Sequence, residues 1–160
     1  MTGYLIQPAR EEDVPGLAGA MRLGDAAEVR ATAGWTPAAA LLASLRATRK
    51  AGGESWTLRI KGEVAALWGV HPLTSLRWTG IVWLLTGQVV ERHRRLFAEL
   101  SRAEVVRLLG TWPRLCNWID ARYGRALRWA EWTGAQLGAP VLFGVEARAF
   151  RKAVWVGHGG

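Results

Sequence analysis

An unbroken apolar run followed by a basic stretch is the feature that most constrains the fold of this chain. Residues 80–85 read Gly-Ile-Val-Trp-Leu-Leu, without the alternation expected of a strand that has one solvated face. Such a run is typical of a central strand that is covered on both sides. Residues 86–88, Thr-Gly-Gln, lead into a predicted helix over 88–100. A buried strand therefore feeds a helix N-terminus, a place where backbone N–H groups bind phosphate in many folds.

The first half of the chain predicts two helices and a hairpin. Asp13 and Pro15 are suited to begin a first helix, and Thr36-Pro37 repeats this signal before a second helix over 38–49. Residues 55–60 and 64–70 alternate as strands do, and Lys61-Gly62 between them predicts a two-residue turn.

The second half predicts further helices and strands. Ser101-Arg102-Ala103-Glu104 has the capping-box pattern, so we expect a second helix, or a kinked continuation, to start there and end near Gly110. Strands are predicted over 115–120, 140–145 and 149–156, and a helix over 122–137. The fold class is α/β (α+β): a single domain over 1–156 with a central mixed, twisted sheet of about six or seven strands, flanked by helices on both faces. Residues 157–160 are predicted to form a disordered tail.

Composition supports one domain with a sizeable core, because the chain has 160 residues of which 50% are hydrophobic. The ten tryptophans are expected mainly in that core, with Trp35 and Trp155 as alternatives for a partner surface. Cys116 is the one cysteine, so no internal disulfide forms, and its apolar strand predicts a buried, inert thiol. No metal site is expected from one cysteine and three scattered histidines.

The chain is basic, with 21 Lys plus Arg against 13 Asp plus Glu and a formal charge of +8. The densest basic region includes Arg92, Arg94, Arg95 and Arg102. It is interpreted either as a surface for nonspecific DNA contact or an acidic protein partner, or as a solvated helix face. Biased codon usage explains the arginine content equally well. Since neither a membrane-spanning run nor a signal peptide is recognised, we expect a protein of the cytoplasm.

The order of predicted elements resembles that of the GNAT family of N-acetyltransferases. Residues 8–14 look like the family's opening strand-to-helix signature, and residues 118–143 resemble its closing strand–helix–strand unit. The resemblance implies an acyl-CoA cofactor held by a glycine-rich loop after the fourth strand. The corresponding residues are Leu85, Thr86, Gly87, Gln88 and Val89.

This chain departs from the family's pattern at four positions that carry chemistry. In the loop only Gly87 is small, and Glu91 adds a charge that opposes a diphosphate. Tyr123 stands where the family has an asparagine, and Ala130 where it often has the tyrosine that protonates the leaving thiolate. Gly134-Ala135 replaces the usual Gly-Phe. These departures favour a protein without acetyltransferase activity, for which no cofactor is expected.

A narrower resemblance involves three segments, residues 22–28, 83–86 and 112–122. They look like a family of small GNAT-like or internal virion proteins of T7-like tailed phages and prophages. This implies a role in virion assembly or DNA ejection, with phage structural or ejection proteins as partners and the virion as a second location. Two alternatives stay open: an acetyl-CoA-dependent N-acetyltransferase acting on an amine or a protein lysine, and a basic DNA-associated module.

Three residues are candidates for catalysis. Asp25 and Glu28 follow the first predicted helix. As paired carboxylates they are interpreted as a binding site for an amine or as a general base. The more favoured alternative is a solvated loop or an ion pair with Arg22 or Arg30. His71 ends a strand near the expected cleft and is interpreted as a general base or as a structural histidine.

Overall fold

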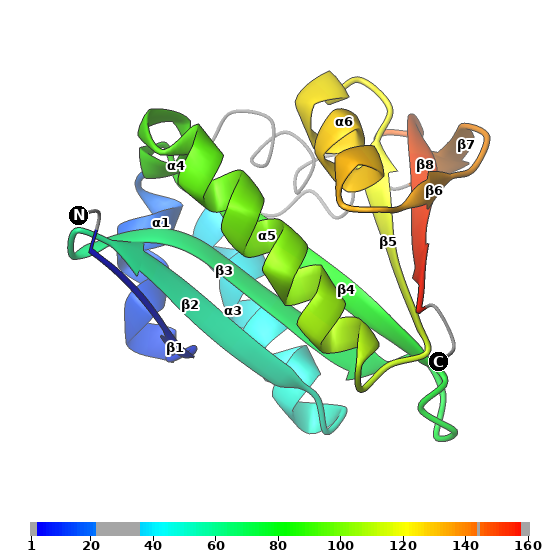
Figure 1. Cartoon of the computed structure of the whole chain (residues 1–160), viewed down its shortest axis with the longest axis horizontal. Coiled ribbons are helices and arrows are strands. Elements are labelled where there is room, and N and C mark those ends of the chain that lie inside the picture. Colours follow the sequence, from blue (N-terminus) through cyan, green and yellow to red (C-terminus); the bar gives the residue numbers. More distant parts are fainter. Residues whose placement is uncertain (1–2, 22–35, 144, 158–160) are drawn as a thin grey trace.

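The computed structural model describes residues 3–21, 36–143 and 145–157. In these ranges eight strands form one mixed sheet with helices on both faces (Figure 1), which confirms the predicted fold class. The strands are β1 Tyr4–Pro8, β2 Glu54–Ile60, β3 Glu63–Pro72, β4 Thr79–Thr86, β5 Arg114–Asp120, β6 Gln136–Leu137, β7 Val141–Phe143 and β8 Arg148–Val156. The helices are η1 Glu11–Asp13, α1 Val14–Ala18, α3 Pro37–Lys50, α4 Val89–Arg92, α5 Arg94–Leu109 and α6 Gly124–Trp132. The two-residue strand β6 accounts for the excess over the expected number.

The sheet opens between its two parallel strands. Its order is β1-β2-β3-β4-β5-β8-β6, with β7 paired to β8, and every described neighbour is antiparallel except β4 and β5. That parallel pairing joins only residues 79–81 to residues 114–116. Beyond it β4 continues to Thr86 and β5 to Asp120 as the strands diverge (Figure 1). A gap therefore forms at the carboxyl ends of both strands.

Strand β4 is covered on both faces, as its apolar run predicts. Trp83 and Leu85 pack against the cluster of α1 and α3, whereas Val82 and Leu84 pack against the clusters under α5. Figure 1 shows α5 in front of the sheet and α3 behind it. The Trp83 indole lies against Gly69 of β3, where a Cβ atom would be 2.6 Å from its Nε1. Only glycine at position 69 leaves room for this ring.

Local turn and cap signals in the first half are mostly confirmed. Lys61 and Gly62 have φ of 50° and 82°, as both central residues of a type I′ turn require. Thr36 caps α3 by accepting a hydrogen bond from the Ala39 N–H at 3.3 Å. Asp13 caps no N–H of α1, but its carboxylate accepts from the Arg10 N–H at 3.0 Å in the capping box of the preceding turn η1. The same buried carboxylate accepts from Thr57 Oγ1 and Arg59 Nη2 at 2.8 and 2.7 Å.

The long helix α5 differs from its prediction. No new helix starts at Ser101: α5 runs without a break over 94–109, and the interruption lies at His93, with φ of −132°. Ser101 donates its hydroxyl to the Phe97 carbonyl at 2.7 Å, four residues back, so it serves no capping role. The predicted end near Gly110 is confirmed. Helix α6 ends at Trp132, earlier than expected, and Gly134 follows with φ of 107°.

Most of the described tryptophans are buried or pack, partly exposed, against the core. Trp112 and Trp155 are buried, so Trp155 is a core residue and marks no partner surface. Trp78 and Trp132 are exposed, and Trp35 lies outside the described residues. Cys116 is buried as predicted, and burial raises the pKa of its thiol. Gly157, in the predicted tail, donates to the Pro113 carbonyl at 3.0 Å, and residues 158–160 lie outside the description. None of the described helices has the length and apolarity needed to span a bilayer.

Candidate ligand-binding site between α5 and α6

A cavity of about 340 Å³ lies where β4 and β5 diverge. Its walls come from the end of β4, from α4 and the start of α5, from β5, and from α6 with its preceding turn. The polar, charged and aromatic residues of its wall include Thr86, Glu91, Arg94, Tyr123, Arg125, Arg128 and Trp129. In open α/β sheets, ligands bind outside the carboxyl ends of the strands at such a switch in connection. The cavity is therefore the first candidate for a binding site.

The charged part of this wall is mainly cationic. Arg94, Arg125 and Arg128 line it, and Glu91 is the one carboxylate among its described lining residues. Arg125 Nη1 lies 3.4 Å from Glu91 Oε1, so an ion pair connects α4 to α6. Since one carboxylate faces three guanidinium groups, the cavity favours an anionic ligand.

The turn before α6 is held by a second ion pair. Arg122 Nη2 lies 2.7 Å from Asp120 Oδ2, and the Arg122 backbone N–H donates to Oδ1 at 2.8 Å. Burial raises the pKa of the Asp120 carboxyl, but the hydrogen bonds and charge of Arg122 outweigh this, so the pKa lies below its ordinary value. This pair holds the turn that follows β5, and Tyr123 and Arg125, which come next in the chain, line the cavity.

Two backbone N–H groups of the predicted cofactor loop are engaged within the protein. The Gly87 N–H donates to the Ala65 carbonyl and the Gln88 N–H to the Ala20 carbonyl, both at 2.7 Å. Gly87 is also closely packed, since a Cβ there would lie 3.1 Å from the Leu17 side chain. These contacts give Gly87 a structural role at the junction of β4, β3 and α1.

The five residues of the predicted cofactor loop lie in different surroundings. Thr86 lines the cavity, whereas Leu85 packs on the other face of the sheet with α1 and α3. Val89 is buried in the cluster below α5, and Gln88 is exposed. Cofactor contact at these positions stays a prediction.

Sequence reasoning missed the helix N-terminus that borders the cavity. The one-turn helix α4 separates β4 from α5, and the first backbone hydrogen bond of α5 runs from Phe97 N to His93 O at 2.9 Å. The N–H groups of residues 94–96 thus belong to the first turn, where a helix supplies no acceptors of its own. Arg94 and Phe97 line the cavity. The adjacent apolar residues Val89 and Val90 were the available signal. Both are buried in the separate turn α4, which precedes the basic helix α5.

Of the three catalytic candidates from sequence, His71 is the one that lies among the described residues. Asp25 and Glu28 lie outside the described residues. His71 pairs with Ile81, at the opposite end of the β3–β4 ladder from Thr86, and its Nδ1 lies 3.3 Å from the Pro72 carbonyl oxygen. It lines neither this cavity nor a smaller one between α5 and the sheet, so a general-base role for it stays a prediction.

The basic residues of α4 and α5 differ in their surroundings. Arg92 pairs with Glu63 at 2.7 Å and Arg95 with Glu99 at 3.2 Å. Arg102 stacks on Trp132, 4.5 Å from the ring centroid. Arg94 alone among these four lines the cavity. Contact with DNA or an acidic partner stays a prediction for them.

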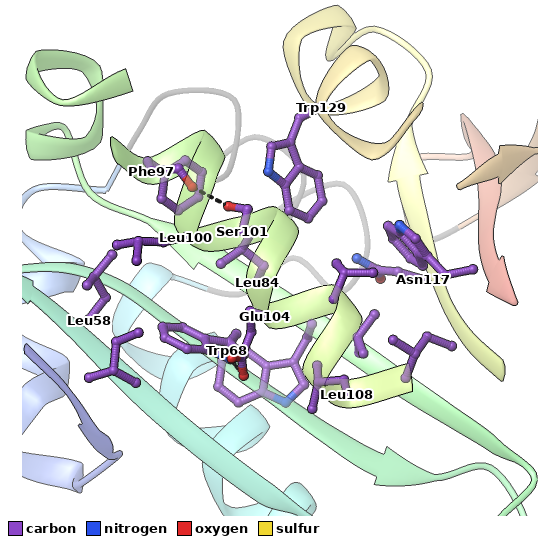
Figure 2. Close-up of a pocket in the computed structure, with 16 residues that line it drawn as sticks. Leu58, Trp68, Leu84, Phe97, Leu100, Ser101, Glu104, Leu108, Asn117 and Trp129 are labelled. Carbon is purple, nitrogen blue, oxygen red and sulfur yellow. Dashed lines mark hydrogen bonds between the residues drawn. The ribbon is translucent and has the colours of Figure 1, made fainter. Parts of the chain in front are cut away.

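A smaller cavity of about 70 Å³ lies between α5 and the sheet (Figure 2). Its lining is mostly apolar, and in it Trp68 Nε1 donates to the Glu104 carboxylate at 3.0 Å. The two cavities share the side chains of Leu84, Phe97, Asn117 and Trp129. They are therefore neighbours: charged residues line the larger cavity, and mostly apolar residues line the smaller one.

A mixed sheet that opens between its parallel strands, with helices on both faces, is the architecture of the GNAT acetyltransferases, and the described part of this chain has that fold. Solved structures of acetyltransferases superpose on nearly all of it. They include RimL, a ribosomal L7/L12 α-N-protein acetyltransferase in complex with CoA, at 10% identity and a TM-score of 0.69, covering 98% of this chain and 95% of the other. An N-acetyltransferase from Staphylococcus aureus is 11% identical with a TM-score of 0.73, covering 96% and 98%.

A third similar structure is yncA from Salmonella typhimurium, a putative acetyltransferase with its cofactor acetyl-CoA. It is 15% identical, has a TM-score of 0.69, and the match covers 99% and 97% of the two chains. No protein-family model matches the sequence, and no curated protein matches it. The comparisons confirm the GNAT resemblance at the level of fold and do not support the narrower phage resemblance. Because two of these neighbours contain CoA or acetyl-CoA, the expectation of no cofactor is not supported either.

Proposed function

We propose that this chain binds acyl-CoA and transfers the acyl group to an amine. The observation that carries the proposal is the cavity at the divergence of β4 and β5, which has three arginines in its wall. The acetyltransferase neighbours, two of which are complexes with CoA or acetyl-CoA, support the same interpretation. This corresponds to the N-acetyltransferase alternative from the sequence.

Charged and apolar residues of the cavity would make different contributions to ligand binding. Arg94 at the start of α5, with Arg125 and Arg128 on α6, would hold the phosphate groups by charge-assisted hydrogen bonds. Leu84, Phe97 and Trp129 would exclude water from the inner end. When bound, acetyl-CoA supplies an acyl group activated as a thioester. The Glu91 charge, which opposes a diphosphate, is partly countered by Arg125.

The proposal is tested by calorimetric titration with acetyl-CoA and CoA. We expect saturable binding that weakens as salt is raised, since exposed charges are screened. Arg94→Ala should weaken binding about five- to tenfold, or about 1 to 1.4 kcal/mol. Arg95→Ala is the matched control, because this neighbouring arginine lines neither cavity and pairs with Glu99. Absence of binding at millimolar ligand would overturn the proposal.

A second candidate is a GNAT-fold protein without acetyl transfer that acts through protein contacts, as in phage assembly or DNA ejection. It is favoured by one observation: the N–H groups of Gly87 and Gln88 are already bonded to Ala65 and Ala20. Under this candidate the titration shows no binding of either ligand, and co-purification with a virion protein is expected.

A further inference from the structure

The indole N–H of Trp129 is a buried hydrogen-bond donor without an acceptor. In the ranges that the structure describes, it is the one buried side-chain nitrogen or oxygen atom left without a partner. Other indoles nearby are satisfied: Trp68 donates to Glu104, and Trp155 to Thr133 at 3.1 Å. Because buried donors are almost always paired, this exception needs an explanation.

The side chain that carries this donor lies where the two cavities adjoin. Trp129 is one of the few side chains that line both, and in Figure 2 its indole nitrogen is on the ring edge that faces helix α5. Packing holds the ring, since the indole of Trp155 meets it edge to face with centroids 6.2 Å apart. A donor that packing holds in place, and that has no acceptor among the described residues, is available to an acceptor from a ligand or from water.

We infer that the Trp129 indole N–H donates a hydrogen bond to a carbonyl oxygen of the ligand that occupies the larger cavity. This inference rests on the proposed function. A phosphate-bearing end would lie near Arg94, Arg125 and Arg128, and the chain of the ligand would lead inward past Trp129. The inner surroundings, which include Leu84 and Phe97, are apolar and suit a neutral carbonyl group. In acyl-CoA such carbonyls belong to the amides of the pantetheine arm and to the thioester.

Trp129→Phe tests the inference, because it keeps an aromatic ring and removes the donor. Trp132→Phe on the same helix is the matched control: Trp132 is exposed and lines neither cavity. Affinities for acetyl-CoA and CoA are measured by calorimetry. The ligand-dependent rise in Tm is recorded for each variant, because this difference subtracts any change in the stability of the free protein.

We expect Trp129→Phe to weaken acetyl-CoA binding about five- to tenfold and to reduce the rise in Tm, with Trp132→Phe unchanged. Equal weakening for CoA assigns the carbonyl to the pantetheine arm, and weakening for acetyl-CoA alone assigns it to the thioester. If wild-type protein binds and Trp129→Phe binds equally well, the inference is overturned while the proposed function stands. If wild-type protein binds neither ligand, both are overturned.

A second measurement covers the case in which Trp129→Phe does not fold. In wild-type protein labelled with ¹⁵N at the indole nitrogens, the Trp129 signal is identified through its contact with the Trp155 ring. With acetyl-CoA this signal should move downfield, and its proton should exchange more slowly with solvent. An unchanged signal at saturating acetyl-CoA would overturn the inference.

Discussion

Glu91 and Arg125 form an ion pair between α4 and α6 in the wall of the larger cavity, with Oε1 and Nη1 3.4 Å apart. Both side chains are roughly half exposed, so the pair is weak, and Arg125 can exchange this partner for a stronger one. The carboxylate therefore competes with an anionic ligand for the same guanidinium group.

Glu91→Gln should strengthen CoA binding about threefold at low salt, because it releases Arg125 and removes the opposing charge. Calorimetric titration at two salt concentrations measures the effect, which should shrink at the higher one. Glu99→Gln makes the same change on α5 outside both cavities and should leave the affinity as it was. Weaker binding by Glu91→Gln would instead mean that the carboxylate contacts the ligand favourably.

Asp13→Ala should lower the free energy of unfolding by about 3 kcal/mol. The Asp13 carboxylate is 2% exposed, and its loss leaves Thr57 and Arg59 without the acceptor that joins η1 to β2. Urea unfolding measures the difference. The exposed neighbour Glu12 is the control, and its replacement by alanine should change stability by no more than about 0.5 kcal/mol. Similar values for the two variants would contradict this role of Asp13.

The Asp120–Arg122 pair predicts a specific acid dependence of stability. Since the pKa of Asp120 in the folded protein lies below the ordinary value of about 3.9, its contribution is complete above that value and is lost as pH falls through the folded pKa. Asp120→Asn should therefore be less stable than wild type at pH 7, by an amount that diminishes below about pH 4. Urea unfolding at a series of pH values tests this. A difference that stays constant down to about pH 2 would contradict it.

Gly69→Ala should destabilise the fold by about 2 kcal/mol, because the added Cβ would lie 2.6 to 2.8 Å from three atoms of the Trp83 ring. Gly3→Ala is the control, since nothing lies within 4 Å of the Cβ position there. Thermal unfolding measures both variants. In a Trp83→Phe background the smaller ring should reduce the cost of Gly69→Ala, and an unchanged cost would place the clash elsewhere.

Features set by neighbours in the sequence were predicted well. The apolar run of β4, the Lys61-Gly62 turn and the Thr36 cap each depend on a few adjacent residues, and the structure confirms them. Asp13 shows the limit of such signals. It has the position of a cap, but Thr57 and Arg59 bind its carboxylate from a strand more than forty residues away.

The candidate site was predicted less well, because it depends on tertiary contacts. Neither glycine nor proline marks the interruption at His93, so the start of α5 was not recognised. The engagement of the Gly87 and Gln88 N–H groups depends on the positions of Ala65 and Ala20. The cavity itself exists because β4 and β5 stop pairing after Ile81 and Cys116, which no local pattern encodes.

The short parallel ladder has a mechanical consequence. With respect to backbone hydrogen bonds, the described sheet consists of two panels, β1–β4 and β5–β8, joined by a seam of three residue pairs. Arg94 and Thr86 belong to one panel and its attached helices, whereas Arg125, Arg128 and Trp129 belong to the other. A ligand that contacts both sets of residues would link the two panels where β4 and β5 no longer pair. Ligand binding would then reduce the motion of one panel relative to the other, and so affect residues of the sheet that do not touch the ligand.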